Sequence, residues 1–473
     1  MTTRHTVVLG SGPTGLVTAL LLAAEGIRVT VLDGDPLPPP GGADAIWDDW
    51  HRPGVHQFRQ THGLLPGGLY LLNQELPGLV EELRATGSPH NMIGGTWAGS
   101  AGSPRQPGDE RYDTVAVRRP VLEALLLAEA ERTPGITVRR GVRVTGLLTG
   151  DAQVAGSPHI TGVVTEDGGR VAAGLLVDAG GRNSPAGRLL GQVGAAPRED
   201  RAETGFRYYT RFFRAPDGAA APPQPAWPLC HHDSVSVLSL PGDSGVWSVT
   251  LVTSGRDQEL RALADPDAWQ RALRLYPLFS PLGEAQPLTG VTAMGGTESR
   301  RRRMVVDGVP VATGIVSLGD AWATANPQFG TGMSLAVRHT VILRDALRLV
   351  GLDDPAELAL RVDAGTEEFL TPVWEGLAHW DRHRLAEIDA EIRGEAYRTT
   401  DEAWNLQVAV ETARWQDPAV LRALADVACL LASPEEALVK SGLGGRAVTL
   451  AAGQPRYAEP GPARPELLTA VGA

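Results

Sequence analysis

The sequence is short of cysteine, of long apolar runs and of positive charge, and each shortage argues against a class of protein. Two cysteines, Cys230 and Cys429, in 473 residues cannot form the disulfide framework of a small secreted domain. No apolar run approaches the ~18 residues of a membrane-spanning helix, and no basic, apolar leader precedes the first predicted strand. Acidic groups outnumber basic ones, 55 to 43, which argues against nucleic acid or an anionic membrane as partner. We therefore expect a cytoplasmic protein.

What the sequence does contain, close to its start, is a glycine-rich turn between two apolar strands. The stretch "VVLGSGPTGLVTALLLAAEGIRVTVLDGD" predicts a strand, a turn, a helix and a second strand that ends on an acid. In such a unit the glycines permit a tight turn, close approach of the backbone to a pyrophosphate, and packing of helix on strand. The terminal acid can accept hydrogen bonds from ribose. The residues expected at a dinucleotide are Gly10, Gly12, Pro13, Thr14, Gly15 and Asp33. NAD and FAD are not separated by this unit.

A second glycine-rich loop, "VSLGDAWATANPQFGTGMSLAV", follows another apolar strand far later in the chain. An acid at a strand end can hold a ribityl hydroxyl, and glycines let backbone N–H groups approach a flat ring. The positive end of the following helix would favour negative charge at the N1/O2 edge of a flavin. This loop therefore favours FAD. Its candidate residues are Gly319, Asp320, Pro327, Gly330, Thr331 and Gly332.

Together the two segments resemble those of FAD-dependent monooxygenases of the aromatic-hydroxylase type, the class A flavoproteins. The wider group includes flavin halogenases, epoxidases and geranylgeranyl reductases. The resemblance implies that the first glycine segment and Asp33 contact the ADP half of FAD, and that Arg119 reaches the flavin or its phosphates. It also implies that Asp320 lies near the ribityl-phosphate, with Pro327 and Gly330 at the isoalloxazine.

The expected fold is α/β, with a Rossmann-like FAD-binding domain, an inserted antiparallel sheet that binds substrate, and a C-terminal helical region. The predicted FAD-binding domain is discontinuous, and comprises residues 1–84, 108–200 and 296–350. Strand-like runs place the substrate sheet in 201–295, and residues 85–107 are assigned to the same domain. The region 351–473 is predicted to be helical with a proline-rich, extended tail, and the run Arg300–Arg303 is interpreted as a solvated strand edge.

One segment departs from the family pattern. In "LLVDAGGRNSPAGRLLG", Gly180 stands where many relatives carry an aspartate that the family links to pyridine-nucleotide use. No second glycine fingerprint follows a strand elsewhere in the sequence. We therefore expect electrons to come from NAD(P)H without a domain of its own, or from a separate flavin reductase.

Residues for catalysis and for substrate are less clearly marked. Arg52 is a candidate for a cofactor or nicotinamide contact because its planar fork suits phosphate, and His56 and Pro327 are further catalytic candidates. Aromatic residues at strand spacing, which could equally be ordinary core, are candidates for a substrate wall: Tyr209, Trp227 and Trp247. The pair His231-His232 near Cys230 lacks metal-ligand spacing, so no metal site is expected.

The predicted activity is transfer of one oxygen atom from O2 to an electron-rich small molecule, by hydroxylation, epoxidation or N-oxidation. In this hypothesis reduced FAD forms a C4a-hydroperoxide whose distal oxygen is passed on. The arginine-rich composition is typical of a GC-rich coding bias, and we expect a role in specialised metabolism such as antibiotic biosynthesis.

Three alternatives remain open. A flavin reductase or dehydrogenase acting on a C=C bond would use the same fold. A halogenase is less favoured. The family resemblance implies that a halogenase has a lysine in the flavin-proximal half that carries hypohalous acid, whereas Lys440 is the only lysine here and lies far down the sequence. A non-enzymatic nucleotide-fold binding protein is disfavoured by the intact phosphate loop.

Overall fold

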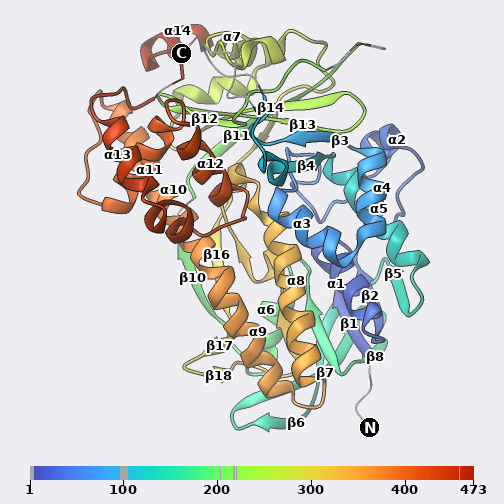
Figure 1. Cartoon of the computed structure of the whole chain (residues 1–473). Coiled ribbons are helices and arrows are strands. Elements are labelled where there is room, and N and C mark those ends of the chain that lie inside the picture. Colours follow the sequence, from blue (N-terminus) through green and yellow to red (C-terminus); the bar gives the residue numbers. More distant parts are fainter. Residues whose placement is uncertain are drawn as a thin grey trace.

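The computed structural model describes residues 5–95, 105–202, 204–216, 219, 221–457 and 459–472 (Figure 1). Part of the predicted substrate segment 85–107, residues 96–104, lies outside this range. Two main sheets organise the chain, one parallel and one antiparallel. In Figure 1 the parallel sheet lies low in the view and the antiparallel sheet high, and helix α8 runs beside the parallel sheet.

The parallel sheet has the order of a dinucleotide-binding fold. Its five strands pair in the order β19-β9-β1-β2-β5, all parallel, which in chain order reads 5-4-1-2-3. This is the Rossmann arrangement, in which ligands bind at the carboxyl ends of the strands where the order reverses. The strands are β1 (His5–Leu9), β2 (Arg28–Asp33), β5 (Ile136–Arg140), β9 (Leu175–Asp178) and β19 (Ile315–Ser317).

Successive side chains along each strand point to opposite faces of this sheet, and both faces are buried. Val8 packs among helices, while its neighbour Val7 packs against a three-stranded antiparallel sheet. Helices α1 (Pro13–Ala24) and α8 (Thr331–Val350) pack on the first side, and a neighbouring cluster joins them to α2 (Ala43–Asp49), α3 (Pro66–Glu75), α4 (Pro77–Thr86) and α5 (Arg119–Arg132). The opposite side has β6 (Val144–Val154), β7 (Ser157–Thr165), β8 (Arg170–Ala172) and α6 (Ala186–Gln192).

The second main sheet is antiparallel, with the order β12-β13-β14-β11-β15. Its strands are β11 (Phe206–Arg214), β12 (Leu229–His231), β13 (Val235–Pro241), β14 (Val246–Ser254) and β15 (Thr292–Met294). Helix α7 (Pro266–Leu273) covers it, and the buried Trp269 donates a hydrogen bond from Nε1 to the Tyr209 carbonyl at 2.9 Å. The fold class expected from the sequence is confirmed.

The arginine run was predicted wrongly as a solvated edge. It forms β16 (Ser299–Arg303), the central strand between β10 (Arg198–Ala202) and β20 (Ala323–Thr324). Arg301 is buried because it pairs with Asp200 at 2.9 Å and lies over the ring of Trp374. These partners come from distant segments, so charge density alone was a poor guide to exposure.

Short elements connect these layers. They are β3 (Ser88–Asn91), η1 (Asp109–Tyr112), β4 (Asp113–Ala116), η2 (Glu259–Ala264), η3 (Ser280–Gly283), β17 (Val305–Val306), β18 (Val309–Pro310), η4 (Gly319–Ala321) and η5 (Pro327–Phe329). The hairpin β17–β18 turns at Asp307 and Gly308, both with positive φ, as the Asp-Gly pair predicted.

The C-terminal region is helical and packs beside the second sheet (Figure 1). It contains α9 (Pro355–Phe369), α10 (Thr371–Ile392), α11 (Glu402–Ala413), α12 (Pro418–Ala428), η6 (Glu435–Lys440), α13 (Leu443–Ala451) and α14 (Arg464–Val471). The proline-rich stretch between α13 and α14 has no helix or strand in its described residues, but the last residues form α14, where Pro465 occupies the first turn and its missing N–H costs nothing. No described helix is long and apolar enough to cross a membrane.

Candidate functional site

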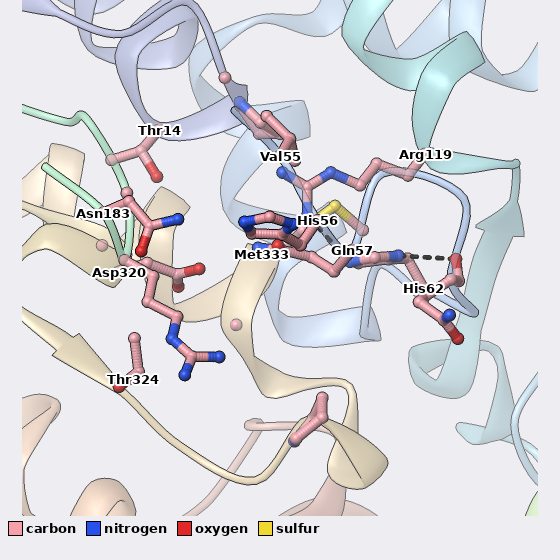
Figure 2. A pocket seen from close by; sticks show the side chains of 18 of the residues that line it. Thr14, Val55, His56, Gln57, His62, Arg119, Asn183, Asp320, Thr324 and Met333 are labelled. Atoms are coloured by element: carbon pink, nitrogen blue, oxygen red, sulfur yellow. Dashed lines mark hydrogen bonds between the residues drawn. The ribbon is translucent and has the colours of Figure 1, made fainter. Parts of the chain in front are cut away.

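A cavity of about 1170 Å³ joins the carboxyl edge of the parallel sheet to the face of the second sheet. Its lining includes the start of α1, the loop from Arg52 to Gly63, the start of α8, strands β11, β13, β14 and β15, and one face of α10. Figure 2 shows Thr14, Asn183 and Asp320 together on one side, with His56 and Arg119 across from them. Cavities for a single small ligand typically measure about 300–1,000 Å³, so this one has room for a large cofactor and a substrate.

The first glycine turn leaves an open approach to the start of α1. Gly10 has φ of +95°, and a Cβ there would lie 2.6 Å from the Ala179 carbonyl oxygen. At Gly15 a Cβ would collide with the Gly10 carbonyl oxygen, so helix and strand touch backbone to backbone. Gly12 is different: a Cβ there meets nothing within 4 Å, and the residue lines the cavity. Helix α1 begins at Gly12 with neither a side-chain cap nor an acid in its first turn. Its N–H groups can therefore receive phosphate oxygens.

The second glycine loop contacts the first. Gly319 has φ of +56°, and a Cβ built on it would lie 2.5 Å from Thr14 Oγ1. Farther along, Gly330 has φ of +65° and begins α8, again without a side-chain cap or an acid in the first turn. Gly332 faces the cavity with nothing within 4 Å of an added Cβ. Two uncapped helix N-termini therefore point to one cavity.

Asp33, at the end of β2, lies in a buried charged cluster. Its Oδ2 accepts hydrogen bonds from the Ser11 N–H and from Arg52, both at 2.6 Å. Burial alone would raise the pKa of Asp33, but Arg52 and the Ser11 and Asp35 hydrogen bonds outweigh it and lower the pKa. The carboxylate therefore remains ionised while it lines the cavity.

The guanidinium of Arg52 pairs with carboxylates of the protein itself. Besides Asp33, it contacts Asp35 at 3.0 Å and Glu123 at 2.6 Å. Burial opposes its charge, but Glu123 and Asp33 raise the pKa of Arg52 further. Arg52 does line the cavity, yet each of its terminal nitrogens already has an acceptor. Its expected contact with a cofactor phosphate stays a prediction, and its structural partners are the acids around Asp33.

Arg119 and Asp320 lie at the same part of the cavity. Arg119, the first residue of α5, donates to Glu123 at 2.7 Å and to His62 Nε2 at 3.0 Å. Burial and the neighbouring Arg119 lower the pKa of His62 to about 3, so this imidazole is neutral. Burial raises the pKa of Asp320, while Arg119 and Arg182 oppose the change. Within the described part of the chain, Asp320 has no hydrogen-bond partner, so its carboxyl is free for a ligand.

The segment that departs from the family pattern also reaches the cavity. Gly180 donates its N–H to Asp178 Oδ1 at 3.1 Å, and Ser184 Oγ donates to the same oxygen at 2.5 Å. A Cβ at Gly180 would lie 3.0 Å from Ser184. An aspartate at this position would therefore crowd Ser184, so the glycine matches its local packing.

The far end of the cavity is built by residues that sequence patterns did not bring together. Tyr208 on β11 donates from its hydroxyl to Asn326 Oδ1, and Asn326 Nδ2 donates to Asp381 Oδ1, both at 2.6 Å. Burial raises the pKa of Asp381 to about 7, and the Asn326 hydrogen bond opposes it. Trp374 and Leu377, from the same helix α10, line the cavity. Their contribution needs the helical region to fold back on the sheet, which no local motif signals.

Three predicted substrate contacts lie elsewhere. Tyr209, Trp227 and Trp247 are absent from the cavity lining and belong to the buried core of the second sheet. Alternation along β11 explains the position of Tyr209, because Tyr208 faces the cavity and the next residue faces the core. His56, Pro327 and Thr331 line the cavity.

The residues present fit FAD. Two helix N-termini without caps suit its phosphates and the polar edge of its ring, and Asp33 and Asp320 can accept hydroxyl hydrogens at opposite ends. Side chains at Gly12 and Gly332 would project into the space left open.

A family model described as the FAD binding domain matches residues 3–351 of this chain. The protein Rv3254 of Mycobacterium tuberculosis is 29% identical over 395 residues, covering 78% of each chain. Rifampicin monooxygenase of Streptomyces venezuelae is 25% identical over 381 residues, covering 80% of this chain and 68% of the relative.

Solved structures share the fold. PqsL of Pseudomonas aeruginosa, described as a probable FAD-dependent monooxygenase, has a TM-score of 0.61 at 18% identity and covers 81% of this chain and 97% of its own. OxyS, the anhydrotetracycline hydroxylase of Streptomyces rimosus, has a TM-score of 0.56 at 21% identity, covering 90% and 76%. The flavin-dependent halogenase CmlS has a TM-score of 0.54 at 18% identity, covering 98% and 76%.

Proposed function

The chain belongs to the family of the FAD binding domain, in the group of FAD-dependent monooxygenases, and on that premise we propose that it oxygenates an electron-rich small molecule. The resemblance expected from the sequence is thereby confirmed. The observation that carries the proposal is that Gly12 and Asp320, from the two glycine segments, line one cavity that continues to the second sheet.

In the proposed enzyme, FAD supplies the redox chemistry that activates O2. The N-terminus of α1 and Gly12 hold the diphosphate, and Asp33 accepts from the adenosine ribose. The N-terminus of α8, with Gly330 and Gly332, stabilises negative charge at the flavin ring by its oriented N–H groups. Asp320 accepts hydrogen bonds from the linking chain. These assignments use only groups that face the cavity.

The substrate would lie between the flavin end and the second sheet. Leu238, Met294 and Trp374 give this end an apolar lining that excludes water. Hydroxyl groups supply polar contacts: Thr61 bonds Ser248 at 3.0 Å, and Thr210 bonds Thr250 at 2.9 Å. Such a lining suits an apolar, aromatic body with a few polar substituents. The relatives named for rifampicin and for anhydrotetracycline support a role in specialised metabolism.

Oxygen transfer is favoured over halogenation by the placement of the single lysine. Lys440 is the last residue of η6 in the C-terminal region and does not line the cavity. Electrons would come from NAD(P)H or from a separate flavin reductase.

The proposal is tested on the purified full-length chain. A flavin absorption spectrum with one FAD per chain is expected. With NADH, NADPH or a flavin reductase as electron source and a panel of phenolic and polycyclic aromatic compounds, we expect O2 uptake and products that carry one atom from 18O2. A colourless protein would favour the binding-protein alternative. Turnover that continues without O2 would favour a C=C reductase, and halide-dependent products would favour a halogenase.

A further inference from the structure

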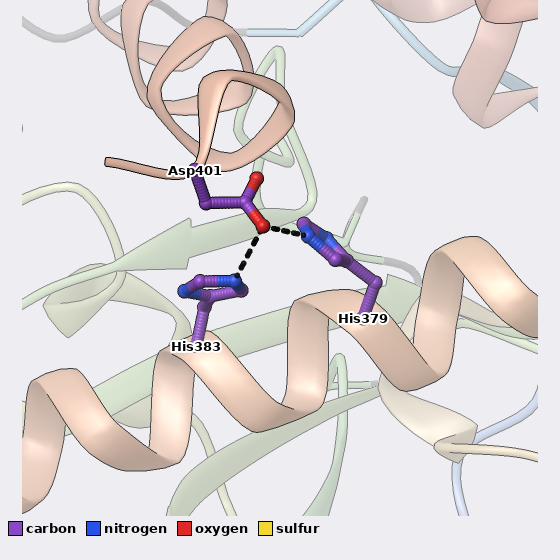
Figure 3. A group of neighbouring side chains, drawn as sticks. All are labelled: His379, His383 and Asp401. Carbon is purple, nitrogen blue, oxygen red and sulfur yellow. Dashed lines mark hydrogen bonds and ion pairs between the residues drawn. The ribbon is translucent and has the colours of Figure 1, made fainter. Parts of the chain in front are cut away.

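Two histidines and an aspartate converge on one another outside the cavity. His379 and His383 lie one turn apart on α10, and Asp401 reaches them from the start of α11 (Figure 3). Both Nε2 atoms approach the same oxygen, Asp401 Oδ2, at 2.9 Å from His379 and 3.2 Å from His383. None of the three residues lines the cavity described above.

The spacing of these atoms is close to that of ligands around a zinc ion. With zinc bonds of 2.0–2.1 Å in a tetrahedron, neighbouring ligand atoms lie about 3.3 Å apart. The three ligand atoms lie within 4.8 Å of one another, and both nitrogen–oxygen distances are within a few tenths of an ångström of that figure. Small side-chain rotations would therefore admit an ion among them.

The surrounding contacts leave one free ligand atom on each of two residues. Asp401 Oδ1 accepts the Trp404 N–H at 3.0 Å as the N-cap of α11, so Oδ2 is the oxygen left for an ion. His383 Nδ1 lies 2.8 Å from the Tyr397 hydroxyl. When Nδ1–H donates to that hydroxyl, the lone pair of Nε2 faces Asp401. Outer contacts of this kind orient metal-binding imidazoles in proteins.

The three candidate ligands differ in their exposure to solvent. The His383 side chain is 7% exposed and its ring stacks on Trp404, with centroids 5.2 Å apart. The side chains of His379 and Asp401 are 26% and 29% exposed. One ligand is thus fixed in the packed interface between α10 and α11, while the other two border solvent, from which an ion and a water ligand can enter.

We propose that His379, His383 and Asp401 bind one divalent ion of the zinc class, with water completing the coordination. The ion would tie α11 to α10. Asp381 lies two residues from each histidine, about 200° around the helix, and bonds Asn326 at the cavity. The ion therefore supports a helix whose other face builds the far end of the cavity. Imidazole with carboxylate is a ligand set that zinc accepts.

The test uses the FAD-loaded full chain, dialysed against a chelator and then titrated with ZnCl2. We expect one zinc per chain by metal analysis, a higher unfolding temperature with zinc, and two imidazole nitrogens in the zinc X-ray absorption spectrum. Each of His379→Gln, His383→Gln and Asp401→Asn should weaken zinc binding at least about tenfold and remove the temperature shift. His51→Gln, at an exposed histidine elsewhere, is the matched control and should bind as wild type does.

Asp401→Asn is the variant least expected to unfold, because asparagine keeps the N-cap acceptor for the Trp404 N–H. Less than a tenth of an equivalent of zinc, or wild-type affinity in all three variants, would overturn the proposal and leave a plain His–Asp–His hydrogen-bond network. An absorption spectrum without imidazole ligands would do the same. FAD content is measured in parallel, so this result does not depend on the proposed oxygenation.

Discussion

Thr14 and Gly319 are packed against each other, although they come from opposite ends of the FAD-binding region. A Cβ at Gly319 would lie 2.5 Å from Thr14 Oγ1, and φ of +56° at this glycine disfavours other residues. This contact places the strand end before Asp320 directly against the first turn of α1. The two glycine segments are thus parts of one binding surface, and each constrains the other.

Gly319→Ala should therefore disturb both segments at once. The left-handed backbone costs an alanine about 1–2 kcal/mol, and the contact with Thr14 adds a steric cost. We expect a lower unfolding temperature and weaker FAD binding, measured by thermal unfolding and by fluorescence titration of the apoprotein. Gly191→Ala in α6 is the control, because nothing lies within 4 Å of its added Cβ. Unchanged FAD affinity in Gly319→Ala would show that the contact is dispensable.

Gly12→Val separates binding from folding. The backbone at Gly12 is extended, with φ of −78° and ψ of 179°, and no atom lies within 4 Å of an added Cβ. Valine suits extended backbone, so the stability of the apoprotein should change by less than about 0.5 kcal/mol. Its side chain would occupy the space expected for the diphosphate, and FAD affinity should fall at least about tenfold. Full flavin content in this variant would contradict the placement of the cofactor.

Arg52 can be assigned to folding or to the cofactor by substitution. Arg52→Met leaves Asp33, Asp35 and Glu123 without their shared cation, and removing one partner of buried ion pairs typically costs about 3–5 kcal/mol. Urea unfolding of the apoprotein should show this loss. Arg361→Met, which breaks an exposed pair with Glu357, should cost no more than about 1 kcal/mol. An apoprotein of wild-type stability with weak FAD binding would instead favour the phosphate contact predicted from the sequence.

A buried histidine behind the second glycine loop predicts a pH dependence. His339 Nδ1 accepts the Gly319 N–H at 3.2 Å, and burial lowers the pKa of His339 from 6.5 to about 3. Between these values the unfolded chain binds a proton that the folded protein does not. Stability contributed by the neutral ring is therefore complete above pH 6.5 and falls as the pH drops toward 3, by about 1.4 kcal/mol per pH unit.

The check is the free energy of unfolding between pH 7 and pH 4 for wild type and His339→Asn. Asparagine Oδ1 can accept from Gly319 but does not titrate. The slope of the free energy of unfolding against pH should therefore be smaller in the variant, by the contribution of about one proton. Other buried histidines with lowered pKa, such as His62 and His90, act in the same direction in both proteins and cancel in the comparison. Identical slopes would mean that His339 is protonated without unfolding.

Sequence patterns were most informative where the structure depends on neighbours in the chain. The strand, glycine turn and helix around Gly12 form a local unit, and so do the hairpin at Asp307 and the strand end at Gly319. The fold class followed from such units and is confirmed. The domain bounds and the roles of individual site residues stay predictions.

Features that depend on distant partners could not be predicted. The burial of Arg301 requires Asp200 on the neighbouring strand and the ring of Trp374 from α10. Whether Tyr208 or Tyr209 faces the cavity depends on the register of β11 within its sheet, and a shift of one residue exchanges the two faces. The cluster of His379 and Asp401 likewise exists only because α11 folds back on α10.

Tyr208 offers the sharpest test of the substrate end of the cavity. Its hydroxyl donates to Asn326 Oδ1 at 2.6 Å, while its ring lies in the core shared by β11 and α10. Tyr208→Phe keeps the ring and removes one hydrogen bond, so the apoprotein should lose only about 1 kcal/mol and FAD should bind as before. Without its tyrosine donor, Asn326 is held only by Asp381 and by the Gln328 N–H, and the wall facing the substrate loses the Tyr208 hydroxyl and is held less firmly.

We therefore expect kcat/KM for the oxygenated substrate to fall about tenfold in Tyr208→Phe, which corresponds to about 1.4 kcal/mol of transition-state stabilisation. The product formed per O2 consumed should fall as well, because a loosely held substrate lets reduced flavin react without transfer. The control is Tyr70→Phe, at a tyrosine that is 61% exposed and does not line the cavity. If Tyr208→Phe matched this control in both measurements, the substrate would have to bind at another part of the cavity, away from Asn326.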